Sequence, residues 1–276
     1  MSTNQGLWNG TFGQIGATLK ALEDAGVTLN HLALLRSDKA LTKAVADLII
    51  EKTINPTEAD KQLLSILEPE RFFGPTDWMR HFGLELPESI ALPILIDELK
   101  SILDGPCPFV NGKTVKETHY LFYLPADIKG APLTVKQWQE MFPDDEQPCF
   151  YSYMEDDAWY NDFAFAKTDT ARFSWFLMFE GVIPGSESKN WEEQIAMKSD
   201  GYEVPKLVEC TPMHFLAYKK NDGQRINENM WGRTCDVDSG GDHVDAGDFD
   251  SDGFGIDSHC DSVRLSSLGL FLFRKF

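Results

Sequence analysis

The sequence predicts an α+β protein that begins with a helical region and continues into a mixed domain of short strands, loops and helices. Before residue 105, apolar residues recur at intervals of three and four, which is the period of one face of a helix. From residue 106 onward, aromatic residues and prolines become dense and the apolar runs shorten to strand length. We therefore expect a helical region over residues 1–105 and a second domain over residues 106–276.

Helices in the first part are expected over residues 15–24, 37–53, 57–67 and 87–103. Gly26 follows the first of them at a position that suits a C-terminal cap. Ser37 is placed to cap the second, and Gly105 with Pro106 ends the last. The apolar stripes of these helices are most simply explained by packing against a core.

The second part is expected to hold strands over residues 119–124 and 172–179, with a helix over 204–218. A further helix is expected to start at Trp191, with Ser188 or Asn190 as its cap. The aromatic side chains between residues 109 and 191 are expected to fill the core rather than contact a ligand. The same location is expected for three cysteines, which are Cys107, Cys149 and Cys210.

Charge and composition argue against several classes of function. The formal charge is −19 and the isoelectric point is about 4.6. Nucleic acids and anionic lipids are bound by basic patches, so we expect neither as a partner. The chain shows no signal-peptide pattern and no apolar run of transmembrane length, which favours a cytoplasmic or virion-associated protein. Its five cysteines include no CxxC pair, which disfavours a disulfide framework.

Residues 235–273 have an unusual composition. They contain nine Asp and one basic residue, Arg264, but no Glu, Lys, Gln, Met or Trp, although these five types supply 58 of residues 1–234. The preference of loops for Asp explains part of this bias and leaves the loss of the other types unexplained. A codon-level cause fits this absence better. If only the adenines of the asparagine codons AAC and AAT change, those five residue types cannot be reached.

This pattern resembles the variable proteins of diversity-generating retroelements, in which adenine-specific mutagenesis alters the 3′ end of the target gene. The residues between the candidate variable positions also resemble the tail of this group: Arg233, Thr234, Val237, Asp238, Ser239, Val244, Gly247, Phe249, Ser251, Gly253, Ile256, Gly269, Arg274, Lys275 and Phe276. Upstream, residues 182–186 and 202–205 resemble the body of the same proteins. The resemblance covers about residues 115–276.

The resemblance implies a C-type lectin-like domain over residues 106–276, of the kind also seen in the formylglycine-generating enzyme. Its variable region would span about residues 235–273 and bind a ligand, which we expect to be a protein, without catalysis and without a cofactor. Apolar residues between the variable positions are expected to anchor short strands in the core: Val237, Val244, Phe249, Phe254, Ile256, Val263, Leu268 and Leu270.

The residues between these anchors are expected to face solvent, where they can change with little effect on stability. The positions expected to contact the ligand are Cys235, Asp236, Gly240, Asp242, His243, Asp245, Asp248, Asp250, Asp252, Gly255, Asp257, Ser258, His259, Cys260, Ser262, Phe271 and Phe273. Because the segment is acidic, we expect its partner to be basic.

A calcium-binding protein is the main alternative. Asp248, Asp250, Asp252 and Gly253 match the start of an EF-hand loop. The match over residues 248–259 is incomplete, because His259 stands where a bidentate Glu is expected and no amphipathic helices flank the stretch.

Zinc binding and catalysis are weaker alternatives. His243, His259 and Cys260 lack the paired short spacing of a zinc site. Catalysis in the formylglycine-generating enzymes uses closely spaced cysteines, whereas Cys235 and Cys260 are 25 residues apart. No GxSxG, Walker or dinucleotide motif occurs, so we expect a binding protein rather than an enzyme.

Overall fold

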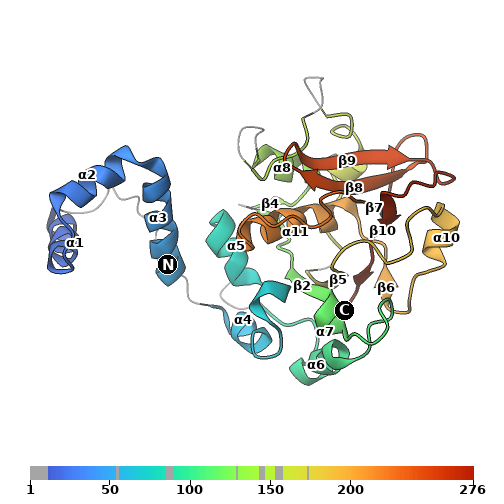
Figure 1. The fold of residues 1–276 in the computed structure, drawn as a ribbon, viewed down its shortest axis with the longest axis horizontal. Coiled ribbons are helices and arrows are strands. Elements are labelled where there is room, and N and C mark those ends of the chain that lie inside the picture. The colour runs from blue at the N-terminus through green and yellow to red at the C-terminus, as the bar shows by residue number, and fades with distance from the viewer. Residues whose placement is uncertain are drawn as a thin grey trace. The chain divides into compact units, whose positions relative to one another are not determined.

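The computed structural model describes residues 12–53, 56–84, 90–128, 130–142, 147–152, 158–172 and 174–276. The chain divides into two compact units, residues 1–54 and residues 55–276. We call their described parts the helical unit and the α+β unit, and describe each by itself (Figure 1). In the described residues, no helix is both long enough and apolar enough to cross a membrane.

The helical unit consists of α1 (Phe12–Asp24), α2 (Leu29–Ser37) and α3 (Lys39–Thr53). Gly26 follows α1 in a left-handed conformation, with φ of 88°, as its predicted capping role requires. No helix was predicted where α2 lies, and Thr28 caps it by accepting a hydrogen bond from the backbone of His31. Ser37 was expected to cap the next helix, but the side chain of Asp38 does so by accepting from Leu41 N at 3.0 Å.

The α+β unit contains nine described helices: α4 (Glu58–Leu63), the 3₁₀ helix η2 (Pro69–Arg71), α5 (Pro75–Phe82), α6 (Ile96–Asp104), α7 (Val115–Thr118), α8 (Val135–Glu140), α9 (Ala164–Lys167), α10 (Trp191–Ile195) and α11 (Leu207–Lys220). The predicted helix at Trp191 is present and is capped by Asn190, which accepts from Glu193 N. The helix predicted over residues 87–103 begins later, at Ile96, and residues 85–89 lie outside the described part of the chain.

One sheet of the α+β unit has the order β1-β2-β5-β11-β6. Its strands are β1 (Phe72–Phe73), β2 (His119–Tyr123), β5 (Trp175–Phe179), β11 (Phe273–Arg274) and β6 (Tyr202–Glu203). β1 runs parallel to β2, and the other pairs are antiparallel. The strands predicted over residues 119–124 and 172–179 are thus confirmed as β2 and β5.

A second sheet, with the order β10-β7-β8-β9, carries most of the unusual C-terminal segment. It consists of β7 (Trp231–Val237), β8 (His243–Asp250), β9 (Gly253–His259) and β10 (Leu268–Leu270), and a separate small hairpin joins β3 (Asp127–Ile128) to β4 (Ala131–Pro132). β10 runs parallel to β7, whereas β7, β8 and β9 are antiparallel neighbours. The C-terminal segment therefore contributes to both larger sheets, because β11 returns to the first one.

The expected boundary near residue 105 does not coincide with the division between the compact units, which falls at residues 54 and 55. Phe72 and Phe73 form β1 and pair with Leu121 and Phe122 of β2, which places residues well before 105 in the first sheet. The change in composition near residue 106 therefore lies within one folded unit.

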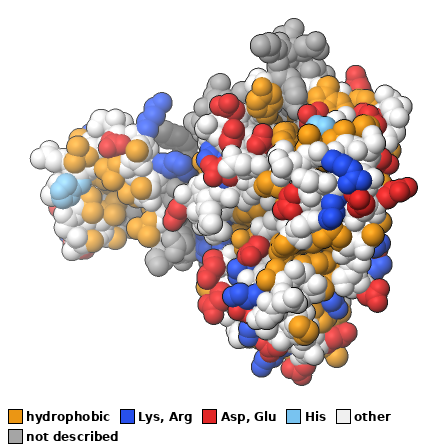
Figure 2. Space-filling view, turned by 45° about the vertical axis from the view of Figure 1, so that its right-hand side comes forward, with side chains coloured by type: hydrophobic (Ala, Val, Ile, Leu, Met, Phe, Trp, Pro, Cys, Tyr) orange, Lys and Arg blue, Asp and Glu red, His pale blue; other side chains and the backbone are white. Residues whose placement is uncertain are grey.

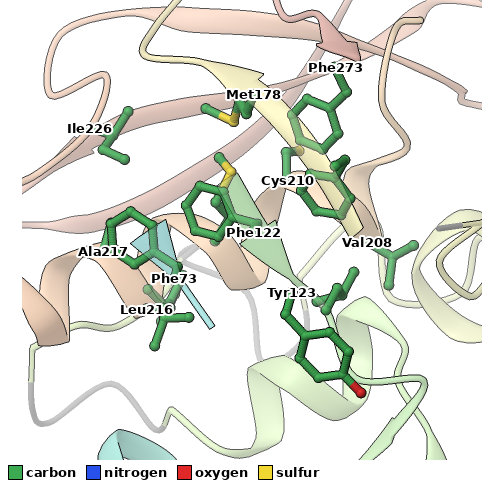
Figure 3. Close-up of a cluster of buried hydrophobic side chains, with 14 of the residues drawn as sticks. Phe73, Phe122, Tyr123, Met178, Val208, Cys210, Leu216, Ala217, Ile226 and Phe273 are labelled. Carbon is green, nitrogen blue, oxygen red and sulfur yellow. The ribbon is translucent and has the colours of Figure 1, made fainter. Parts of the chain in front are cut away.

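A continuous aromatic core joins the two larger sheets through α11, in which every residue from Leu207 to Ala217 is buried. Figure 3 shows side chains of α11 beside those of β1, β2, β5 and β11. Phe73 stacks on Phe122, and Phe176 stacks on Phe273, with ring centroids 4.4 Å apart in each pair. On the other side, Phe215 of α11 lies 5.6 Å from the ring of Phe249 in β8. Cys107, Cys149 and Cys210 are buried, as predicted.

Phe271 holds the end of the chain against the second sheet. Its side chain is fully buried, and its ring lies so close to Gly232 of β7 that a Cβ atom there would come within 2.3 Å of it. Glycine at this position is therefore what allows the ring to approach the strand so closely.

Truncating Phe271 to Ala should lower the free energy of unfolding by about 3–5 kcal/mol, because a buried aromatic side chain is lost and a cavity remains. Leu265→Ala, at a position with 39% exposure, serves as the control and should cost less than about 1 kcal/mol. Urea unfolding of both variants measures the difference. Similar losses for the two would contradict the structural role of Phe271.

Candidate functional site

The strands of the second sheet bring distant parts of the C-terminal segment into register. Val237 of β7 lies opposite His243 of β8, which in turn lies opposite His259 of β9. Two residues further along β8, a second row aligns Arg233 of β7, Asp245 of β8 and Asp257 of β9. Because side chains alternate between the faces of a sheet, the members of both rows project from the same face.

Twelve of the seventeen positions expected to contact a ligand are exposed or half-buried: Cys235, Gly240, Asp242, His243, Asp248, Asp250, Asp252, Asp257, Ser258, His259, Cys260 and Ser262. Six of the eight expected anchors are buried: Val244, Phe249, Phe254, Ile256, Leu268 and Leu270. The other two depart from the prediction, since Val237 is 47% exposed and Val263 is half-buried.

The remaining five of the seventeen positions are buried, so the expectation that they face solvent was wrong: Asp236, Asp245, Gly255, Phe271 and Phe273. Phe271 and Phe273 belong to the aromatic core described above. Gly255 lies against the indole of Trp231, and a Cβ atom added there would come within 2.3 Å of the ring. Asp236 and Asp245 are buried because their carboxylates interact with polar groups of the protein, as described next.

Asp236 fixes the start of α11. Its carboxylate accepts a hydrogen bond of 2.5 Å from the backbone N–H of Leu207, one of the N–H groups that the first turn of a helix leaves without a helical partner. Burial raises the pKa of Asp236 to about 6. This residue therefore joins β7 to α11 and is not available to a ligand.

Asp245 belongs to a buried charge cluster with Arg233 and His259. His259 Nδ1 lies 2.6 Å from Asp245 Oδ2, and Arg233 Nε lies 3.8 Å from Asp245 Oδ1. The hydrogen bond to Asp245 raises the pKa of His259, whereas burial raises the pKa of Asp245 itself. Both side chains at the centre of the cluster, Arg233 and Asp245, are 0% exposed.

The guanidinium of Arg233 also holds the loop that follows β9. It donates to the backbone carbonyls of Cys260 and Val263 at 3.1 and 3.3 Å. A third hydrogen bond, of 3.2 Å, reaches the side chain of Gln194 in α10. Because Gln194 in turn donates to Leu268 O, this network ties α10, the loop and β10 to the face of the sheet.

Eleven of these twelve positions fall at two ends of β8, and the twelfth, Cys235, lies on β7. We call the first group the histidine end: Gly240, Asp242, His243, Asp257, Ser258, His259, Cys260 and Ser262. The second is the tip of the β8–β9 hairpin, with Asp248, Asp250 and Asp252. His243 and Asp250 are the terminal residues of β8, which places them roughly 23 Å apart at about 3.3 Å per residue. The seventeen positions therefore do not form one continuous site.

At the histidine end, His243 is held between two residues that the sequence pattern did not single out. Its ring stacks on Trp191, with centroids 3.6 Å apart, and its Nδ1 lies 2.6 Å from Asp261 Oδ1. Trp191 was expected among the core aromatics, but it is half-buried. The sequence did contain one indication that Asp261 belongs to this surface, because it stands between Cys260 and Ser262, which were both expected to contact the ligand.

The turn between β7 and β8 is shaped by Asp238, which was expected to belong to the framework. One carboxylate oxygen accepts from the N–H groups of Gly240 and Asp242 at 2.7 and 3.0 Å. The other accepts from the hydroxyl of Ser258 at 3.0 Å, which links the turn to β9. Asp238 thus fixes the backbone beneath the exposed side chains of the turn.

The hairpin tip has a different geometry from an EF-hand loop. Asp248 and Asp250 lie on β8, and Asp250 pairs with Gly253 across a turn formed by Ser251 and Asp252. The N–H of Asp252 donates to the carboxylate of Asp250 at 2.7 Å, so this carboxylate supports the turn itself. Within the described ranges, no group of three or more His, Cys, Asp or Glu side chains is arranged to hold a metal ion.

Two cysteines and a histidine are the groups near the histidine end that could support catalysis. The Cys260 thiol lies 3.3 Å from the Ser262 hydroxyl, and the Nδ1 of His259 is engaged by Asp245. Burial raises the pKa of Cys235 to about 11, which keeps it protonated and weakly nucleophilic at neutral pH.

Comparisons with known proteins give no independent guide to this surface. No family model, no curated protein and no solved structure matches the chain. The interpretation of the site therefore depends on its residues and their geometry.

Asp245→Asn should lower the free energy of unfolding by about 3 kcal/mol, because it leaves the buried charge of Arg233 without its carboxylate. The pKa of His259 should fall in the same variant, since the hydrogen bond to the Asp245 carboxylate is what raises it. Denaturant unfolding measures the first effect, and an NMR titration of the imidazole measures the second.

The matched control is Asp257→Asn, because Asp257 lies opposite Asp245 in the register but is exposed. It should change the free energy of unfolding by no more than about 0.5 kcal/mol. If the two variants are equally stable, Asp245 has no structural role.

Proposed function

We propose that this protein displays a diversified ligand-binding surface, formed by the histidine end, and that it is the variable protein of a diversity-generating retroelement. The observation that carries the proposal is the separation of roles within one segment. Exposed side chains at the histidine end project from a backbone that buried residues hold in place, among them Arg233, Val244 and Ile256. A surface of this kind tolerates substitution, because its folding does not depend on the side chains that change.

The composition of the segment supports the same proposal. Every residue type at the histidine end, namely Gly, Asp, His, Ser and Cys, can be reached from an asparagine codon by changing adenines alone. A C-type lectin-like fold for residues 106–276 is part of the proposal. Its support is that the exposed positions of residues 240–262 project from one small sheet and its loops, as such a fold requires of a variable protein.

The ligand we propose is a basic protein surface. Asp242, Asp257 and Asp261 place carboxylates at or beside the histidine end. The nearby cation Arg264 is engaged by Glu193 at 2.5 Å, which offsets its charge. Carboxylates presented in this way favour partners with Lys and Arg side chains.

Sequencing the DNA that flanks the gene tests the retroelement proposal most directly. We expect a reverse-transcriptase gene and a near-copy of the 3′ end that differs only where the copy has adenine. The mismatches should fall in codons of exposed residues such as Asp242, His243 and Asp257. They should spare the codons of Asp245 and Phe271, whose side chains are buried.

Two results would contradict this. Without a near-copy, the missing residue types lose their codon-level explanation. A copy whose mismatches fall mainly on buried positions would show that the exposed surface is not what is diversified. In the first case the alternative of calcium binding at Asp248, Asp250 and Asp252 becomes the next to test, by titration with calcium.

The ligand class is tested by neutralising two carboxylates at the histidine end. Asp242→Asn combined with Asp257→Asn should weaken binding to a lysine- and arginine-rich peptide at least about fivefold at low salt, because the local negative field is reduced. Isothermal titration calorimetry measures the affinity.

The charge-matched control replaces two exposed residues elsewhere in the α+β unit, Asp97→Asn with Asp200→Asn. It removes the same total charge and should change the affinity less than about twofold, because neither carboxylate lies at the proposed surface. Equal weakening in the two double variants would mean that net charge, rather than this surface, drives binding.

A further inference from the structure

The helical unit has no core of its own among its described side chains. None of the side chains described between residues 12 and 49 is buried, and neither α1 nor α2 contains a buried residue. Isolated helices of this length are marginal in water, and most of their stability in proteins comes from burying an apolar face. Caps such as Thr28 and Gly26 define where these helices begin and end, but they do not supply that burial.

Instead, large apolar side chains of the helical unit are exposed to solvent, and Figure 2 shows them gathered over its surface at the left of the view. Nine are more than a third exposed: Phe12, Ile15, Leu19, Leu22, Leu29, Leu34, Leu41, Leu48 and Ile49. If such a side chain presents roughly 150–200 Å² when fully exposed, the nine together present on the order of 800 Å². Each partner in a stable interface covers about 800 Å². The nine side chains lie on all three helices, so the contact proposed below would cover part of this area.

The apolar side chains of α1 follow the spacing of a helix–helix seam. Phe12, Ile15, Leu19 and Leu22 are separated by three, four and three residues, which places them along one face. We call these four residues the α1 stripe. Helices with this spacing pack by inserting each apolar side chain between those of a facing helix.

An open groove of about 750 Å³ lies beside the α1 stripe, between α1 and α2. Leu19 and Leu22 line it on the α1 side, and Leu29 and Leu32 line it on the α2 side. The groove can therefore receive apolar side chains from a facing helix, and two of the stripe residues are part of its wall.

The charge of the chain is divided unevenly between the two units. Residues 1–54 contain five Lys and Arg and five Asp and Glu, so the whole formal charge of −19 lies on residues 55–276. Two copies of the acidic unit repel each other, whereas the neutral helical unit does not oppose association. Because the helical unit has no net charge, it would not select a strongly charged partner of another kind.

We propose that the helical unit joins two copies of this chain, with the α1 stripe of one copy packed against the α1 stripe and groove of the other. A symmetric contact of this kind needs a surface complementary to itself. The α1 stripe and the groove beside it provide such a surface, because Leu19 and Leu22 belong to both. The inference does not depend on the proposed ligand-binding function.

Sedimentation equilibrium of the full chain tests the proposal. The wild type should sediment at twice the monomer mass of 31.2 kDa at micromolar concentration. Ile15→Glu combined with Leu19→Glu should sediment as a monomer, because two carboxylates would face their copies across the interface. Ala17→Glu with Ala21→Glu is the charge-matched control on the opposite face of α1 and should remain a dimer.

A rescue experiment separates loss of the interface from unfolding of the helices. Ile15→Lys with Leu19→Lys should also be monomeric alone, and a mixture with the Glu variant should sediment at twice 31.2 kDa. A wild type that sediments at 31.2 kDa even at about 100 μM, well above the Kd of a micromolar dimer, would overturn the proposal. So would a Glu variant of the stripe that remains dimeric, or a mixture that stays monomeric.

Discussion

The buried guanidinium of Arg233 is the interaction on which the candidate site depends. A charge removed from water is tolerated only where it is hydrogen-bonded and compensated. Asp245 of β8 compensates the charge of Arg233 as an ion pair at 3.8 Å. The guanidinium donates hydrogen bonds to Gln194 of α10 and to the carbonyl groups of Cys260 and Val263, while its Nε has no hydrogen-bond partner among the described residues. Segments that are far apart in the sequence are thereby held at fixed positions around one side chain.

If the surface is diversified as we propose, this arrangement would let its side chains vary while the scaffold stays the same. The loop after β9 is held by its backbone carbonyls, so the exposed side chains of Cys260 and Ser262 are not what positions it. The turn before β8 is held in the same way, because Asp238 binds its N–H groups. His259 is the exception, since its ring is fixed by Asp245. Its replacement would leave that buried carboxylate with one partner fewer.

Local signals in the sequence were sufficient for much of the secondary structure. Caps and apolar periodicity located α1, α10 and α11, and short runs of aromatic and other apolar residues located β2 and β5. These elements could be predicted because their signals lie within a few residues of each other. The position of β1 could not, since Phe72 and Phe73 join the sheet through a partner strand that lies far along the chain, at Leu121 and Phe122.

Exposure at the candidate site was predicted less well, for a physical reason. The pattern of residues in a strand shows which side chains share a face, but not what covers that face. Asp245 and Asp257 share a face and a register row, yet the first is 0% exposed because Arg233 and His259 cover it. Asp236 is likewise buried by the start of α11, which no local pattern reveals.

The acidic repeat at residues 248–252 matches a calcium-binding motif in sequence, but in the structure its residues form the end of a strand and a turn. Alternating Asp residues followed by Gly match the first positions of a calcium loop, but they also suit the end of a strand and a tight turn. In the structure Asp250 stabilises that turn, and Gly253 has a φ of 124°, which a residue with a side chain rarely adopts. Spacing alone could not separate these two uses, because both favour the same residue types.

Joining two copies through the helical unit would give the proposed binding function a physical advantage. A surface diversified at the codon level samples side chains without refining the fit of each one, so the affinity of a single surface is expected to be modest. When two such surfaces are linked, the second binding event becomes intramolecular and the overall affinity can rise by about 10²–10⁴ without new contacts. The division of charge fits this scheme, because the neutral unit would associate while the acidic unit stays free to bind. In that case the exposed apolar side chains of the helical unit and the proposed variable end of the second sheet would act together in multivalent recognition.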